Sequence, residues 1–228
     1  MNMVASAIFG LAGAFSGFFI PDIAQKIAVY KCGKKNMALP ADRRYTSVLL
    51  KMAFCVFNAA AWALSGLFME KPAVSFFMSA LITVAALVAV TDMRIRLVPN
   101  ELVFVILTLG AVFQILHLGF GSLLNSAVCM IAMIVFFTAA AGFVGFGKVG
   151  AGDVKLAGAM GFVLGYPNII IALAILCAVL FLYTLSGLIL KKLTLKSMFP
   201  FAPFMMTGMV AALVFIVFES MFFPGSTF

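Results

Sequence analysis

Residues 74–90 read VSFFMSALITVAALVAV, an apolar run without a charged residue, and Thr91 and Asp92 follow it directly. A helix that crosses a bilayer needs about 20 predominantly apolar residues, so this run predicts a transmembrane helix. The same character extends along all 228 residues, of which 65% are apolar and 10% are charged, whereas soluble domains hold about 25% charged residues. The composition excludes a water-soluble globule and a disordered chain, and it predicts an all-α polytopic membrane protein.

Eight apolar runs are long enough or apolar enough to be counted as candidate helices. They cover residues 4–20, 48–68, 74–90, 99–118, 123–143, 154–165, 169–190 and 202–223. The sixth run is short for a crossing, and Gly158, Gly161 and Gly165 make it a poor isolated helix. Because glycines also let neighbouring helices approach closely, we expect a short helix surrounded by protein. The sequence therefore predicts a bundle of about eight transmembrane helices.

The basic residues predict how this bundle is oriented. With eight crossings, Lys71 is the only one of the 15 Lys and Arg residues on its side of the membrane. Cytoplasmic loops carry the excess of Lys and Arg in membrane proteins, so we expect the basic loops in the cytoplasm and the N-terminus outside. Six crossings would also gather the positive charges, but would leave a very apolar stretch outside. No Lys or Arg precedes Val4, so the first run is expected to be a retained anchor.

Domain organisation, charge and cysteine content each point to a single membrane domain without a metal site or disulfides. We expect one membrane domain over 1–228, with the first helix and a short basic cytoplasmic segment in 1–51 and the helix bundle in 52–228. The net charge of +8 comes from clusters beside apolar runs, which indicates contact with anionic lipids and not with nucleic acid. The four cysteines show no CxxC spacing, so we expect no metal site and no disulfide framework.

Two of the seven acidic residues stand out by their position. Asp92 follows an apolar run without a polar spacer, and Asp153 heads the short sixth run, so both are expected at membrane depth near the cytoplasmic surface. Ionisable residues at such depth are costly and usually functional. The other five have ordinary explanations as solvated loop or helix-end charges, with Glu101 suited to the dipole of the helix it starts. They are Asp22, Asp42, Glu70, Glu101 and Glu219.

The spacing of the two aspartates alone leaves three interpretations open. If the carboxyl groups converge, one would hold a proton near neutral pH, and the pair could act as acid and base like an aspartic-protease dyad. Each could instead pair with a basic neighbour, for which Arg94, Lys148 and Lys155 are available. They could also handle protons or cations in a membrane carrier, although a carrier more often shows internal repeats and charges at mid-bilayer.

Three motifs resemble those of a known family. The stretch DMRIRLVPN at 92–100 resembles the first aspartate motif of type IV prepilin peptidases and preflagellin peptidases. The stretch GAGDVKL at 150–156 matches the second, the GxGD motif of these intramembrane-type aspartic proteases. FPFAPF at 199–204 is similar to the late Pro-Phe-Gly-Pro-Phe element, with Ala in place of Gly. Together these motifs span roughly half of the chain.

The resemblance implies a membrane aspartic endopeptidase, located in the cell (cytoplasmic) membrane, that needs no cofactor. Such enzymes cut the short basic leader from type IV pilin-like precursors at the cytoplasmic face, just before the hydrophobic helix of the precursor. Carried over by position, Asp92 and Asp153 become the catalytic pair. The supporting residues that the resemblance implies are Gly150, Gly152, Lys155, Pro99, Asn100, Pro200 and Pro203.

The chain departs from many bacterial members of this family in one segment. Those members carry two CxxC pairs after the first helix and also methylate the new N-terminus, whereas residues 21–51 contain only Cys32. We therefore expect the peptidase without the zinc segment, and N-methyltransferase activity stays open.

The basic loops raise a question about substrate recognition. A basic leader would be repelled by them at long range, so we expect the loops to bind anionic lipids. The leader would then be recognised by packing of its adjoining helix and by a local acidic contact, for which Asp22 and Glu101 are both candidates.

Overall fold

The computed structural model describes residues 3–36, 47–69, 71–144, 150–191 and 199–222. Over these ranges the chain forms helices and no strand, which confirms the all-α prediction. The helices are α1 (Met3–Lys34), α2 (Val48–Phe68), α3 (Pro72–Ile95), α4 (Asn100–Leu118), α5 (Ser122–Val144), α6 (Ala151–Leu164), α7 (Asn168–Ile189) and α8 (Ala202–Phe222). The expectations for Asp42, Glu70 and Lys148 lie outside the described residues.

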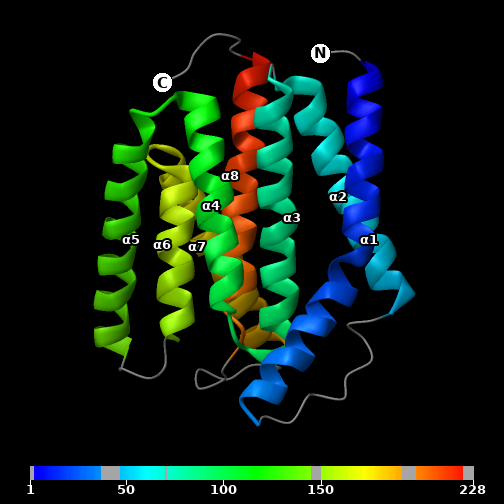
Figure 1. Cartoon of the computed structure of the whole chain (residues 1–228). Helices are drawn as coiled ribbons and strands as arrows, with labels where there is room; N and C mark the ends of the chain where they lie inside the picture. The colour runs from blue at the N-terminus through cyan, green and yellow to red at the C-terminus, as the bar shows by residue number, and fades with distance from the viewer. Residues whose placement is uncertain (1–2, 37–46, 70, 145–149, 192–198, 223–228) are drawn as a thin grey trace.

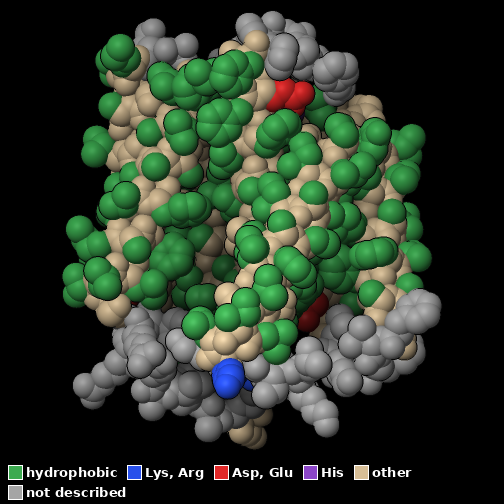
Figure 2. Space-filling model, turned by 180° about the vertical axis from the view of Figure 1, so that it is seen from behind, with side chains coloured by type: hydrophobic (Ala, Val, Ile, Leu, Met, Phe, Trp, Pro, Cys, Tyr) green, Lys and Arg blue, Asp and Glu red, His purple; other side chains and the backbone are tan. Residues whose placement is uncertain are grey.

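The helices run along a common direction, with α1 and α2 on one flank of α3 and with α5 and α6 on the other side of α4 (Figure 1). The start of α1 and the end of α8 lie at the same end of the bundle. Seven of the eight helices are long and apolar enough to cross a membrane, and α6 falls short of that length. Hydrophobic side chains cover the flank in Figure 2, where the charged side chains in view lie toward the two ends. This is the surface of a multi-pass membrane protein.

Close packing of α6 on α5 explains how a glycine-rich segment forms a helix. A Cβ at Gly161 would lie 2.7 Å from the backbone oxygen of Cys129, and a Cβ at Gly158 would lie 2.8 Å from the Ile134 side chain. These two glycines allow the close approach that the sequence predicts. Gly165 plays another part, because its φ of +61° ends the helix.

The first helix is longer than the sequence predicts. We expected it to end near residue 20 and a polar segment to follow, but α1 continues through Pro21 to Lys34. A proline inside a helix removes one backbone hydrogen bond and bends it, and α1 in Figure 1 turns so that its second half passes beneath the bundle. Ala24, Ala28 and Cys32, spaced four residues apart, are buried on this half. Their burial explains why the segment stays helical despite its charges.

Buried polar contacts fix α3, which carries Asp92, against its neighbours. Asn58 of α2 donates hydrogen bonds to the backbone oxygen of Gly13 at 3.1 Å and to Thr83 Oγ1 at 3.0 Å. Trp62 Nε1 donates to the same Thr83 hydroxyl at 3.0 Å. Because buried polar groups need partners in a low-dielectric interior, this network sets how α1, α2 and α3 lie relative to each other.

Candidate active site

Asp92 lies in the last turn of α3 and is 4% exposed. Its Oδ2 accepts a hydrogen bond from the backbone N–H of Ala202, the first residue of α8, at 3.2 Å. The first N–H groups of a helix have no partner within it, and the helix dipole favours a negative charge there. The start of α8 therefore orients the Asp92 carboxylate.

Asp153 lies in the first turn of α6, where its Oδ2 accepts a hydrogen bond from the N–H of Gly150 at 3.2 Å. Burial raises the pKa of the Asp153 carboxyl above its ordinary value, and the hydrogen bond from Gly150 opposes that rise. The glycines beside it leave little spare room. A Cβ at Gly152 would lie 3.2 Å from Val98 Cβ, so the first turn of α6, which holds the GxGD motif, packs its backbone onto the connection between α3 and α4.

Both aspartates line one pocket of about 510 Å³ at the end of the bundle. Its wall is built from the end of α1, the α3–α4 connection, the start of α6 and the segment before α8. It gathers eight of the nine site residues that the sequence predicts: Asp92, Pro99, Asn100, Gly150, Gly152, Asp153, Lys155 and Pro200. Pro203 is not part of this wall and lies within the first turn of α8.

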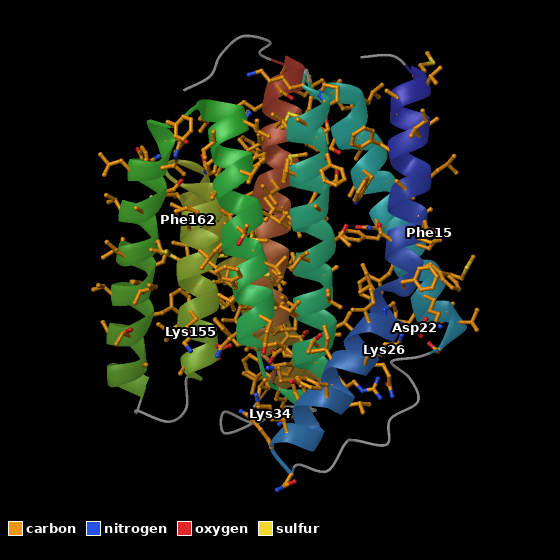
Figure 3. All side chains as sticks on the ribbon, viewed as in Figure 1. Phe15, Asp22, Lys26, Lys34, Lys155 and Phe162 are labelled. Atoms are coloured by element: carbon orange, nitrogen blue, oxygen red, sulfur yellow. The ribbon has the colours of Figure 1, made fainter. Side chains whose placement is uncertain are left out.

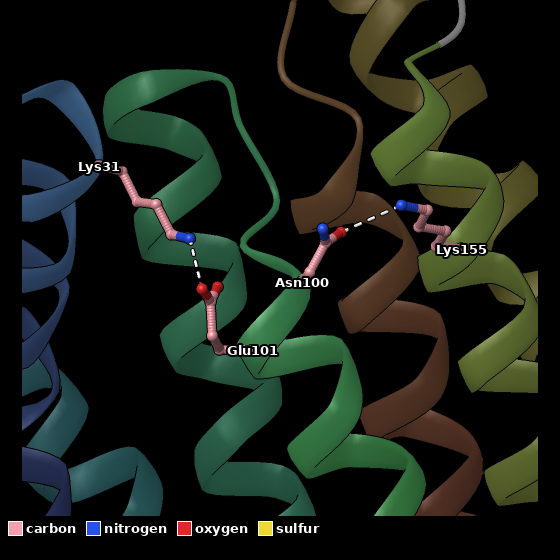
Figure 4. Close-up of polar contacts among 4 residues, drawn as sticks. All are labelled: Lys31, Asn100, Glu101 and Lys155. Carbon is pink, nitrogen blue, oxygen red and sulfur yellow. Dashed lines mark hydrogen bonds and ion pairs between the residues drawn. The ribbon is translucent and has the colours of Figure 1, made fainter. Parts of the chain in front are cut away.

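Two polar contacts connect helices around the pocket (Figure 4). Lys155 of α6 donates a hydrogen bond to Asn100 Oδ1 of α4 at 3.2 Å, and Lys31 of α1 forms an ion pair with Glu101 of α4 at 2.6 Å. Lys155 is therefore hydrogen-bonded to the α3–α4 motif. The structure places Asn100 and Lys155, which come from two different motifs, side by side.

The pocket wall also contains residues that the sequence analysis did not select. Lys31 comes from the second half of α1 and Lys35 directly follows that helix, in a stretch that was expected to be a separate loop. The four-residue spacing of Ala24, Ala28 and Cys32 is the signal that could have found them. Figure 3 labels Lys26 and Lys34 on this half of α1 and Lys155 at the start of α6, all toward the same end of the bundle.

One side of the pocket is aromatic and the rest is rich in positive charge. Phe199 and Phe201 line it, and the Phe199 ring lies 5.6 Å from that of Tyr183 on α7. Lys31, Lys35, Arg96 and Lys155 are its basic wall residues. The pocket thus combines two carboxyl groups, an apolar surface and a positive rim.

Comparison with known proteins agrees with this arrangement. Residues 79–190 match the type IV leader peptidase family. The chain is also 30% identical over 196 residues to the prepilin leader peptidase/N-methyltransferase of Bacillus subtilis (strain 168), an alignment that covers 84% of this chain and 72% of that protein. The chain belongs to the type IV leader peptidase family. No solved structure matches it.

Family membership confirms the resemblance drawn from the motifs and makes this leader peptidase a hydrolase. The family match begins within α3 and ends just after α7, so it contains both aspartates of the pocket. The FPFAPF segment, which leads into α8 and donates the hydrogen bond to Asp92, lies beyond the matched residues.

Proposed function

We propose that this leader peptidase removes the basic leader from type IV pilin-like precursors, prepilins or preflagellins, with Asp92 and Asp153 as its catalytic residues. One observation carries the proposal. The two carboxyl groups come from different helices and different motifs, yet both line the same pocket. Each also accepts a hydrogen bond from a backbone N–H at a helix N-terminus, which holds it in place.

The chemistry follows from two carboxyl groups in one partly buried pocket. Two such groups do not both ionise readily, so the pair holds one proton and titrates as a unit. The ionised carboxylate takes a proton from a water molecule as the water oxygen attacks the scissile carbonyl carbon. The protonated partner donates a hydrogen bond to the carbonyl oxygen, where negative charge develops, and a proton then passes to the leaving amine.

We further propose that the pocket end faces the cytoplasm in the cell membrane, and that the whole chain acts as one membrane domain. The concentration of 14 of the 15 basic residues on one side under eight crossings supports this orientation. The same residues would contact anionic lipid headgroups, and we propose no nucleic-acid partner.

We propose a peptidase without methyltransferase activity. The Bacillus subtilis relative carries N-methyltransferase in its name, but this chain has no CxxC pair among its four cysteines. Mass spectrometry of the mature product checks this point. The N-terminal residue of the mature product is expected without an added methyl group. A product heavier than the unmethylated peptide by about 14 Da, the mass of one CH₂ unit, contradicts the proposal.

Co-expression with a pilin-like precursor tests the peptidase proposal. We expect the wild-type chain to remove the leader, and Asp92→Asn and Asp153→Asn each to leave the precursor intact while accumulating in the membrane. Asp22→Asn is the matched control, because Asp22 is acidic and at the same end but pairs with Lys51 outside the pocket wall. Leader removal by either pocket variant overturns the dyad. Asp-dependent proton uptake by reconstituted vesicles, without leader removal, would favour the carrier instead.

A further inference from the structure

The positive rim of the pocket raises the question of how a basic leader binds there. Lys31, Lys35, Arg96 and Lys155 all line the pocket, and like charges repel. Apart from the two aspartates of the pocket, the described acidic residues at this end of the bundle are Asp22 and Glu101. If a described side chain forms the acidic contact with the basic leader, that side chain therefore belongs to Asp22 or to Glu101.

Asp22 forms an ion pair that joins α1 to α2. Its Oδ2 lies 2.6 Å from Lys51 Nζ, and the Lys51 ammonium also lies over the Phe18 ring, 5.4 Å from its centre. The Asp22 side chain is 34% exposed, and it does not line the pocket. Its position next to the Pro21 bend fits a role in holding α1 against α2.

Glu101 does not line the pocket either, but it lies directly beside residues that do. It follows directly after Pro99 and Asn100, both of which line the pocket, and its side chain is 65% exposed. Its ion-pair partner Lys31 is 15% exposed and lines the pocket (Figure 4). A lysine ammonium group is therefore already bound to the exposed Glu101 carboxylate.

We propose that Glu101 binds a basic side chain of the leader, and that Lys31 occupies this carboxylate until the leader displaces it. The inference rests on the proposed cleavage of basic leaders. An exposed ion pair contributes little to stability, so the leader exchanges one Lys–Glu contact for another at little cost. A neutral leader offers no such exchange, so the contact selects basic leaders in spite of the positive rim.

Steady-state cleavage with two precursors tests this, one with its native basic leader and one with the leader Lys and Arg residues replaced by Gln. We expect Glu101→Gln to raise KM for the basic leader by up to about fivefold, the upper end for one exposed ion pair, with kcat unchanged and with KM for the Gln leader unaffected. We expect Lys31→Gln to lower KM for the basic leader, because it frees Glu101. Asp22→Asn is the matched acidic control and keeps the wild-type preference.

A purely structural bridge between α1 and α4 would give a different pattern. Lys31→Gln and Glu101→Gln would then change KM in the same direction, for both leaders alike, and this outcome overturns the inference. Charge reversal provides a second test. Glu101→Lys is expected to cleave a leader with Glu in place of its basic residues better than the native leader, and an unchanged preference also overturns the inference.

The two proposals fail in distinguishable ways. A wild-type chain that releases neither leader overturns the proposed function and this inference with it. A wild-type chain that cleaves the basic leader, together with a Glu101→Gln variant of unchanged KM, overturns only the role of Glu101.

Discussion

Asp92 Oδ2 accepts a hydrogen bond from the backbone N–H of Ala202, a residue 110 positions further along the chain. The contact joins the end of α3 to the start of α8, and it makes the FPFAPF segment part of the site. The segment also supplies Phe199, Pro200 and Phe201 to the pocket wall. The late motif therefore has a physical task, which is to orient the carboxylate of the first motif.

The donor at Ala202 can be removed without removing the helix start. Proline has no N–H but is tolerated in the first turn of a helix, so Ala202→Pro is expected to lower kcat by about tenfold to a hundredfold, the scale of a hydrogen bond to a charged group. Ala202→Gly keeps the N–H and is expected to keep near wild-type kcat. Cleavage kinetics of the purified variants check both, and equal losses in the two would show that the side-chain volume matters and not the donor.

Asp153, proposed above as a catalytic residue, is expected to reduce the stability of the fold at neutral pH. Because burial raises its pKa in the folded chain, the protonated form is favoured on folding, and this contribution is lost as pH rises through the folded pKa. Asp153→Asn removes the ionisation, so its thermal unfolding temperature in detergent at neutral pH should equal or exceed that of wild type. The difference should shrink as the pH falls toward about 4, the ordinary Asp pKa. A variant that is less stable than wild type at neutral pH contradicts this account.

The orientation of the bundle can be measured with single-cysteine chains in a cysteine-free background. Lys34 is exposed at the pocket end, and Lys71 is exposed at the start of α3, at the opposite end. We expect a membrane-impermeant thiol reagent applied outside intact cells to label Lys71→Cys and to spare Lys34→Cys. Labelling of Lys34→Cys alone would reverse the proposed orientation.

The contact between α5 and α6 should be sensitive to a single methyl group. Gly161→Ala places a Cβ 2.7 Å from the Cys129 backbone oxygen, and overpacking of this kind costs about 1–3 kcal/mol. Gly33→Ala in α1 is the matched control, since a Cβ there meets nothing within 4 Å, and it should be neutral or stabilising because Ala favours helix. Thermal unfolding of the two variants checks this, and equal unfolding temperatures would contradict it.

Sequence patterns were sufficient to predict helices and candidate site residues where a single physical requirement dominated. Long apolar runs specify membrane helices, and the motifs around Asp92 and Asp153 marked the residues that the structure brings into one pocket. The second half of α1 was missed because its buried stripe of Ala24, Ala28 and Cys32 is narrow and because charged residues, Lys26, Lys31 and Lys34, interrupt the apolar pattern. The four-residue spacing could have suggested a helix, but that the stripe packs on α3 is a tertiary fact that the spacing does not give.

The pairing of Lys31 with Glu101 could not be predicted from the sequence, because it too depends on tertiary structure. Each residue has an ordinary local explanation, Lys31 near a helix C-terminus and Glu101 near an N-terminus. Only the bend in α1 brings them to 2.6 Å.

The hydrogen bond from Ala202 to Asp92 also bears on biosynthesis. A ribosome makes the chain from its N-terminus, so α3 and its aspartate are complete long before residue 202 exists. The carboxylate receives its backbone donor only when α8 has been made and has inserted beside α3. The nascent protein is therefore expected to be inactive until α8 has been made, and proteolytic capacity arises only with that helix.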